Sequence, residues 1–177
     1  MKRPDTKKAK NPPDTAKARV LVVGTDVASR FMDYTDRGTC ILFGDGSGAV
    51  VLEATSADEG VLSLVLGSDG SMGHHLTLGS PGGFGTPNGA QSVDRAFMKM
   101  NGPEVFRFAV KVMGEAAAEA VVKAGLTFQD IDILIPHQAN LRIIDTAAKR
   151  LELPRERVWV NVERYGNTSS ASVPITR

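Results

Sequence analysis

Two stretches near the carboxyl end decide the fold of this chain: IPHQANLR at residues 135–142 and YGNTSSAS at residues 165–172. Each follows an apolar run typical of a strand, and each precedes a pattern typical of a helix. His137 and Asn167 are therefore expected where a strand ends and a helix begins, which is the edge of an α/β sheet that gathers reactive groups. This placement predicts one site shared by the two side chains.

The sequence before these stretches indicates strands joined by turns. Residues 20–23 form a continuous apolar run, which predicts a strand buried on both faces of a parallel sheet. Two further apolar runs within residues 39–54 flank a glycine run, where a turn inside the sheet is expected because glycine permits backbone angles closed to other residues. Residues 60–67 indicate another strand, which leads into a surface excursion or pocket lip over residues 68–92.

Helical periodicity is strongest in the second half of the chain. Apolar residues recur at three- and four-residue intervals over residues 103–125, with a proline in the first turn and a glycine past the end. The pattern then predicts a helical turn, a strand, a helix and a strand at residues 127–130, 131–135, 140–151 and 158–162. A strand, a helix and a strand in succession indicate a parallel crossover and the α/β class.

The two opening stretches resemble the β-ketoacyl-acyl-carrier-protein synthase III family of fatty-acid synthesis, as do TDRGTCILFGDGSGAVVL at residues 35–52 and MNGPEVF at residues 100–106. The resemblance implies an α/β, thiolase-like layered fold. Residues 18–177 would form a partial condensing-enzyme domain, comprising the end of the first half and most of the second. The family's cysteine nucleophile lies upstream of these blocks. We therefore expect a carboxyl-terminal fragment that lacks this cysteine, has an incomplete fold and is inactive in full condensation alone.

The family's activity is an acyl transfer, the decarboxylating Claisen condensation of acetyl- or acyl-coenzyme A with malonyl-ACP, where ACP is the acyl carrier protein. Decarboxylation builds enolate charge on the thioester oxygen, and fixed hydrogen-bond donors lower that barrier. A neutral imidazole and a carboxamide suit this role, and the resemblance implies His137 and Asn167 as the catalytic pair. Taken singly, a histidine after a proline and an asparagine before Thr and Ser are also common structural residues and helix caps.

The resemblance also implies which residues meet the substrates. Recognition of ACP is expected from Gln138, Ala139, Asn140 and Arg142. The substrate and coenzyme A pocket is expected from Met100, Gly102, Phe106, Ala139 and Asn140. Phe106 is explained equally well as a wall of the acyl pocket or as a core aromatic. Arg142 with Lys149 and Arg150 would make either a cationic patch for an acidic carrier protein or a solvated helix face.

Composition narrows the setting, with 42% hydrophobic residues and a formal net charge of +1. This charge provides no field for nucleic acid, and no apolar run approaches a membrane span. The one cysteine, Cys40, excludes an internal disulfide and is expected to pack rather than to act as a nucleophile. His74 and His75 would point oppositely on an extended chain, so no metal is expected. We expect a cytoplasmic protein without a cofactor, since coenzyme A and phosphopantetheine thioesters are substrates.

Residues 1–17 form a basic leader with six Lys or Arg, two Asp and three Pro. Disorder is predicted there because little apolar surface is available to offset the entropy of ordering. Such a leader could dock an acidic partner or be a solvated extension. The family is homodimeric, but this implies little about the oligomeric state of this chain, which lacks much of the family's dimer contact. Uncovered apolar faces nevertheless predict that the chain associates with itself. The alternative to an enzyme is a non-catalytic remnant that binds acyl carrier protein or a synthase subunit.

Overall fold

The computed structural model describes residues 19–56, 59–78 and 97–176. The predicted basic leader, residues 1–17, lies outside these ranges. Within them, no helix combines the length and the apolar composition that crossing a bilayer requires.

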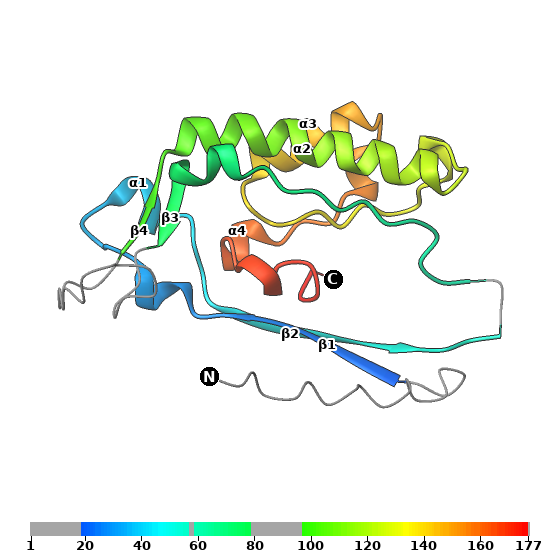
Figure 1. Cartoon of the computed structure of the whole chain (residues 1–177), viewed down its shortest axis with the longest axis horizontal. Helices are drawn as coiled ribbons and strands as arrows, with labels where there is room; N and C mark the ends of the chain where they lie inside the picture. The colour runs from blue at the N-terminus through cyan, green and yellow to red at the C-terminus, as the bar shows by residue number, and fades with distance from the viewer. Residues whose placement is uncertain (1–18, 57–58, 79–96, 177) are drawn as a thin grey trace, which may run out of the picture.

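The described chain is arranged in layers. The helices α2 (Gly102–Lys123) and α3 (Leu141–Arg150) lie on one side, and the strands β1 (Arg19–Asp26) and β2 (Gly46–Glu53) lie on the other (Figure 1). The carboxyl-terminal turn η6 (Ser169–Ala171) lies between these layers and contacts the strand pair. Residues close to the carboxyl end are thus inside the molecule, where a site can be built on them.

β1 and β2 pair antiparallel along their whole length, beginning with Arg19 opposite Glu53. The strand predicted at residues 20–23 is present, but the prediction that it pairs in a parallel sheet is wrong. The prediction of burial is also wrong, because Leu21 is 64% exposed and the rest of the run is exposed as well. Parallel pairing needs a crossover of a dozen or more residues that is usually helical, whereas residues 27–45 contain only short helical turns.

Two other strand predictions in this half are wrong. The apolar run before the glycines is not a strand, because it continues from the helical turn α1 (Arg37–Cys40), which follows η2 (Ala28–Phe31). Residues 60–67 form no strand either, and Leu66 there is 84% exposed. A strand requires a hydrogen-bonded neighbour, and no described segment pairs with these residues.

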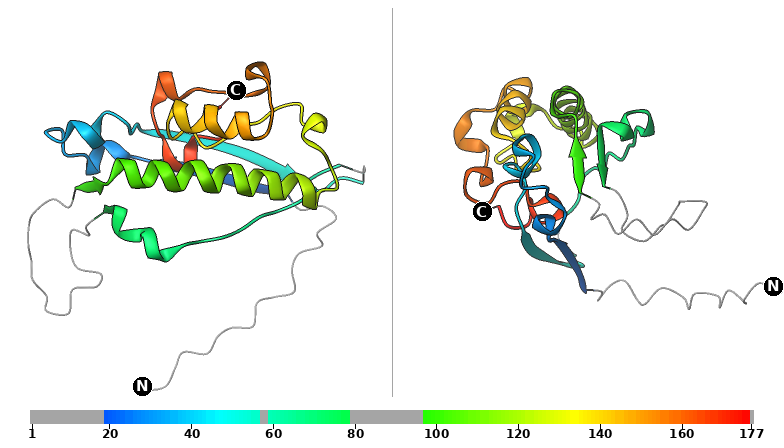
Figure 2. Two further views of the ribbon diagram at one scale, coloured as in Figure 1. Left: turned by 90° about the horizontal axis from the view of Figure 1, so that it is seen from above. Right: turned by 90° about the vertical axis from the view of Figure 1, so that its left-hand side faces the viewer.

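The two long helices confirm the helical predictions. α2 follows Asn101 and has Pro103 in its first turn, and the chain leaves it through Gly125, whose φ of +72° suits glycine. α3 follows Asn140, whose side-chain oxygen accepts a hydrogen bond from the Arg142 N–H at 2.9 Å. The helices run side by side (Figure 2).

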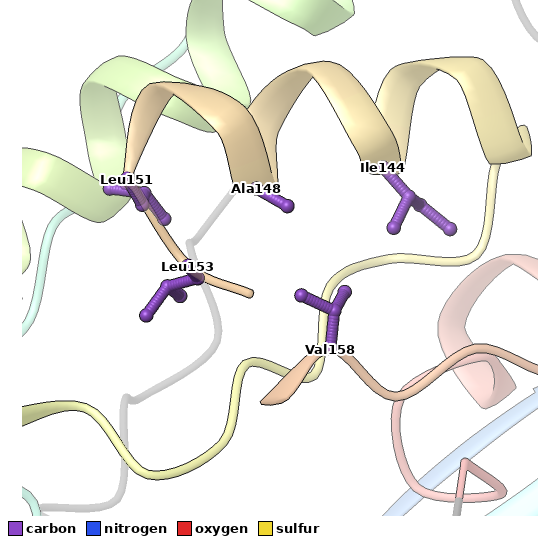
Figure 3. Close-up of a cluster of buried hydrophobic side chains, with 5 residues drawn as sticks. All are labelled: Ile144, Ala148, Leu151, Leu153 and Val158. Atoms are coloured by element: carbon purple, nitrogen blue, oxygen red, sulfur yellow. The ribbon is translucent and has the colours of Figure 1, made fainter. Parts of the chain in front are cut away.

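The core lies where α3 and the loop after it face each other. Its buried apolar residues, drawn in Figure 3, are Ile144, Ala148, Leu151, Leu153 and Val158. Ala117 and Ala118 of α2 pack against this cluster, and their small side chains let the two helices approach closely. Ile144 is fully buried, which stabilises the fold by about 2–3 kcal/mol relative to an exposed side chain.

In place of the strands predicted at residues 131–135 and 158–162, the structure has one isolated parallel bridge, between Leu134 and Val158. The Leu134 N–H donates to the Arg157 carbonyl at 2.7 Å, and the Trp159 N–H donates to the Leu134 carbonyl at 3.0 Å. The predicted parallel direction is confirmed, whereas the predicted strand lengths are not. One bridge still places the start of the 135–142 stretch beside the segment that leads to Asn167.

Short elements complete the described fold. The predicted turn at residues 127–130 is confirmed as η4 (Phe128–Asp130), and the later turns are η5 (Arg155–Arg157) and α4 (Val162–Tyr165). η3 (Gly70–His75) leads into β3 (Leu76–Leu78), which pairs antiparallel with β4 (Met98–Met100). The first part of the predicted excursion therefore packs beside β4, and residues 79–92 lie outside the described ranges.

Candidate active site

A buried amide holds the loop that carries His137. Gln138 has no exposed surface, and its side-chain NH₂ donates to the carbonyls of Pro136 at 2.9 Å and Trp159 at 3.3 Å. Its side-chain oxygen accepts from the N–H groups of Asn161 at 2.8 Å and Val162 at 3.2 Å. One side chain therefore joins the histidine loop to the segment that leads to Asn167.

The imidazole of His137 is held from one side. Its Nδ1 lies 2.7 Å from the Oγ of Ser172, a residue that is almost completely buried. His137 is exposed as a residue, but the protein around its ring partly desolvates it, which lowers the pKa of His137 below the ordinary value for histidine because the charged form loses solvation. The neutral form of the imidazole is therefore favoured, and its Nε2 has no hydrogen bond to another residue of the described ranges.

The backbone of Asn167 is fixed between two loops. Its N–H donates to the carbonyl of Leu42 at 2.8 Å, and its carbonyl accepts from the Gly44 N–H at 3.0 Å. A side chain at Gly44 would place its Cβ 2.1 Å from the carbonyl oxygen of Tyr165, so this close approach requires glycine. The side-chain oxygen of Asn167 accepts from the Ser169 N–H at 2.9 Å, and among the described residues its amide NH₂ has no acceptor, so it can donate to a ligand.

The loop that carries Asn167 is also tied to β1. The Asp26 carboxylate accepts hydrogen bonds from the Ser170 N–H, at 3.0 Å, and from the Ser170 hydroxyl. The hydroxyl is the main reason that the pKa of Asp26 lies below its usual value. Gly24 permits this approach, since a Cβ there would lie 2.3 Å from the Ser170 carbonyl oxygen. The loop therefore has anchors on β1 and on residues 42–44.

The two candidate catalytic residues open onto one cavity. This cavity, of about 590 Å³, is lined by His137, Asn167 and mainly apolar side chains of α2 and η3. A neighbouring cavity of about 510 Å³ also includes Asn167 in its lining. The second cavity brings together all five residues expected to line the substrate pocket: Met100, Gly102, Phe106, Ala139 and Asn140. The cavities share six lining residues, so a bound molecule could extend from one into the other.

The residues expected to contact ACP divide into two groups. Gln138 is fully buried, which contradicts a direct contact with a docked protein, and its four hydrogen bonds assign it a structural role instead. Ala139 and Asn140 line the second cavity, and Asn140 also caps α3. Arg142 is exposed, and its guanidinium lies 5.3 Å from the centre of the Phe106 ring, at the edge of that cavity.

The proposed cationic patch is only partly available. Arg150 lies 3.5 Å from Glu115 of α2, and its stem covers Gly114, where a Cβ would lie 2.6 Å from the Arg150 Cδ. Its charge is therefore partly compensated. Lys149 and Arg142 are exposed and seven residues apart on α3, so both lie on the same helix face.

Of the remaining candidate residues, Cys40, His74 and His75, one lines the cavity of His137 and Asn167, namely His75. Cys40, at the end of α1, does not line either cavity. His74 and His75 belong to η3, and their ring centroids are 3.9 Å apart, so the expectation that they point oppositely on an extended chain is wrong. Within the described ranges, no group of three or more His, Cys, Asp or Glu could hold a metal ion.

Sequence reasoning missed two contacts of the site. One is the hydrogen bond from Ser172 to His137, and the other is the pairing of Phe43 with Asn167 as a parallel bridge. Both join residues far apart in the chain. Ser172 belongs to the stretch at residues 165–172, but nothing in that stretch indicates which distant side chain it meets.

Comparison with known proteins identifies the family. Residues 14–70 match the model for 3-oxoacyl-[acyl-carrier-protein] synthase III, and residues 121–176 match the model for the C-terminal part of the same family. The two matches together span more than half of the chain. The chain belongs to the β-ketoacyl-acyl-carrier-protein synthase III family. Synthase III proteins of Symbiobacterium thermophilum and Staphylococcus saprophyticus are 52% and 50% identical over 157 residues, covering 88% and 89% of this chain and 47% and 46% of theirs.

Solved synthase III structures show the same fold. The Thermus thermophilus protein superimposes with a TM-score of 0.78 at 50% identity, covering 89% of this chain and 48% of that protein. The Pseudomonas aeruginosa protein gives a TM-score of 0.78 at 38% identity, covering 89% and 47%. The fold is accordingly thiolase-like α/β, as predicted. The chain spans about half the length of the synthase III relatives that it matches.

Proposed function

We propose that this chain supplies the malonyl-decarboxylating part of a β-ketoacyl-ACP synthase III active site. The observation that supports it best is the shared cavity: His137 and Asn167, from loops some thirty residues apart, line the same space. Each is held by a bond that leaves a nitrogen free, Nε2 of the imidazole and the NH₂ of the amide. Two donors on one cavity match the need of a thioester oxygen that gains negative charge.

In the proposed reaction, the malonyl thioester places its carbonyl oxygen between the two donors. The bond between the α-carbon and the carboxylate breaks, CO₂ leaves, and the electron pair moves into an enolate whose oxygen His137 and Asn167 stabilise. That carbanion equivalent then attacks an acyl thioester in full condensation, or takes a proton to give an acetyl thioester. Cys40, the one cysteine in the sequence, lies outside the cavity, so no acyl-enzyme step is assigned to this chain.

The second cavity suits the arm of the thioester. Its lining includes two small residues, Gly102 and Ala139, beside which a ligand can reach the main chain, and also the Phe106 ring and Asn140. An extended pantetheine chain in this cavity would contact all four residues. Arg142 at its edge is exposed and would meet the acidic carrier protein. In this proposal the thioesters of coenzyme A and phosphopantetheine are substrates, and the chemistry calls for no cofactor.

Release of CO₂ from malonyl-ACP, labelled in the carboxylate, tests the proposal with this chain. His137→Ala and Asn167→Ala are each expected to lower the rate by about 10²–10³-fold, as loss of one oxyanion donor does elsewhere. His74→Ala is the matched control, because His74 is exposed and lies outside the cavity lining. A rate that His137→Ala leaves unchanged would refute the enzymatic proposal. Binding of malonyl-ACP without turnover would favour the non-catalytic binding module instead.

A further inference from the structure

One hydrogen bond at the site has no role in the proposed reaction. The Ser172 Oγ is 2.7 Å from the His137 Nδ1, and Ser172 is only 1% exposed. We propose that the Ser172 hydroxyl donates to Nδ1 and thereby fixes His137 as the Nε2–H tautomer, which makes Ser172 a positioning residue. The proposal concerns the direction of this bond and rests on the proposed function only for its catalytic consequence.

The direction follows from counting donors and acceptors. A serine hydroxyl has one hydrogen to donate, and a neutral imidazole has one N–H and one bare nitrogen. Among the hydrogen bonds of the described residues, His137 Nδ1 is the only partner of Ser172 Oγ. If Nδ1 carried the proton, the serine hydrogen would be buried without an acceptor, which is unfavourable. If the hydroxyl donates, the buried serine hydrogen is satisfied. The hydrogen without a protein partner is then Nε2–H, which belongs to an exposed residue and points away from Ser172.

The backbone holds the serine in place. The Ser172 N–H donates to the Ser169 carbonyl at 3.1 Å, and the Ser172 carbonyl accepts from the hydroxyl of buried Thr176 at 2.6 Å. Hydrogen bonds therefore fix the peptide groups on both sides of Ser172. A hydroxyl on such a rigid turn can hold the imidazole ring in one orientation.

The same short turn serves both candidate catalytic residues. Asn167 is five positions before Ser172, and its side-chain oxygen accepts from the Ser169 N–H in that turn. The turn thus presents the Asn167 amide directly and orients the His137 ring through Ser172. With Nε2–H as the outward group, both residues are donors, as the proposed stabilisation of an enolate oxygen requires.

The test is an NMR titration of the ¹⁵N-histidine-labelled chain, with His137→Ala used to assign the resonances. Two-bond ¹H–¹⁵N correlations report which ring nitrogen carries the proton, and Nε2–H is expected in the unmodified chain. Donation by Ser172 stabilises the neutral ring, so Ser172→Ala is expected to raise the measured pKa of His137 by about 0.7 unit. The other titratable groups lining the cavity, Asp69, His75 and Glu104, are the same in both proteins.

Ser170→Ala is the matched control, since Ser170 is on the same turn and bonds Asp26 rather than His137. It is expected to leave the His137 pKa unchanged. An Nδ1–H tautomer in the unmodified chain would overturn the proposal, even if Ser172→Ala fails to fold. So would a lowered or unchanged His137 pKa in Ser172→Ala, or an equal shift in Ser170→Ala. None of these readouts depends on turnover, so they can fail or succeed separately from the decarboxylation assay.

Discussion

Replacing Gln138 with leucine tests whether this residue is structural. The change keeps the volume similar but removes the partners of four main-chain groups in two loops. Each hydrogen bond is worth about 1 kcal/mol net, and burial of the leucine methyl groups returns about 1 kcal/mol. The expected loss in the free energy of unfolding is therefore about 3 kcal/mol. Loosening of the loop should also weaken the placement of His137.

Urea denaturation of the chain, followed by circular dichroism, measures this loss as a fall in the midpoint at an unchanged slope. Gln129→Leu is the matched control, because Gln129 is exposed, and its change should stay within about 0.5 kcal/mol. If Gln138 contacted the carrier protein instead, its leucine variant would keep its stability and lose affinity for ACP. A stability change below about 0.5 kcal/mol in Gln138→Leu would therefore refute the structural assignment.

Three further predictions address the anchors and the exposed strands. Gly44→Ala, whose Cβ would meet the Tyr165 carbonyl at 2.1 Å, should lose at least about 2 kcal/mol in urea denaturation, whereas Gly67→Ala, with open space, should not. The lowered pKa of Asp26 means that its carboxylate stabilises the fold above its unfolded pKa of about 3.9 and that this contribution disappears as the pH falls through the lower folded value. The stability difference between the unmodified chain and Asp26→Asn should therefore shrink between pH 6 and pH 2, and a constant difference would contradict it. The chain should self-associate in analytical ultracentrifugation through its exposed apolar strands, and Leu21→Lys should reduce association; a monomer at all concentrations would count against this.

The helices could be predicted from sequence and the strands largely could not. Helical hydrogen bonds are local, so the apolar periodicity over residues 103–125 was sufficient to predict α2, and α3 lies within the helix predicted at residues 140–151. Strands are defined by partners elsewhere in the chain. The apolar run at residues 20–23 correctly indicated a strand, but not that it would pair antiparallel with β2 or remain exposed. Residues 60–67 have strand composition and no described partner, so they are not a strand.

The candidate site was likewise predicted only in part. His137 and Asn167 were expected together from their stretches and from the family resemblance, and the structure brings them to one cavity. Gln138 was expected to take part in carrier recognition because of its motif, whereas the structure buries it against the loop at residues 159–162. The contact from Ser172 to His137 spans 35 positions, and no local pattern could indicate it.

In the proposed reaction His137 and Asn167 donate to a single thioester oxygen, and isotope-edited infrared spectroscopy would detect these two hydrogen bonds. The probe is acetyl-pantetheine with a ¹³C-labelled carbonyl, bound to the chain and to its two single alanine variants. Two donors polarise the carbonyl, so its stretching band should move to lower frequency on binding, and each variant should lose part of that shift. A bound carbonyl with no shift, or a shift that survives both substitutions, would show that the two side chains do not donate to the thioester oxygen.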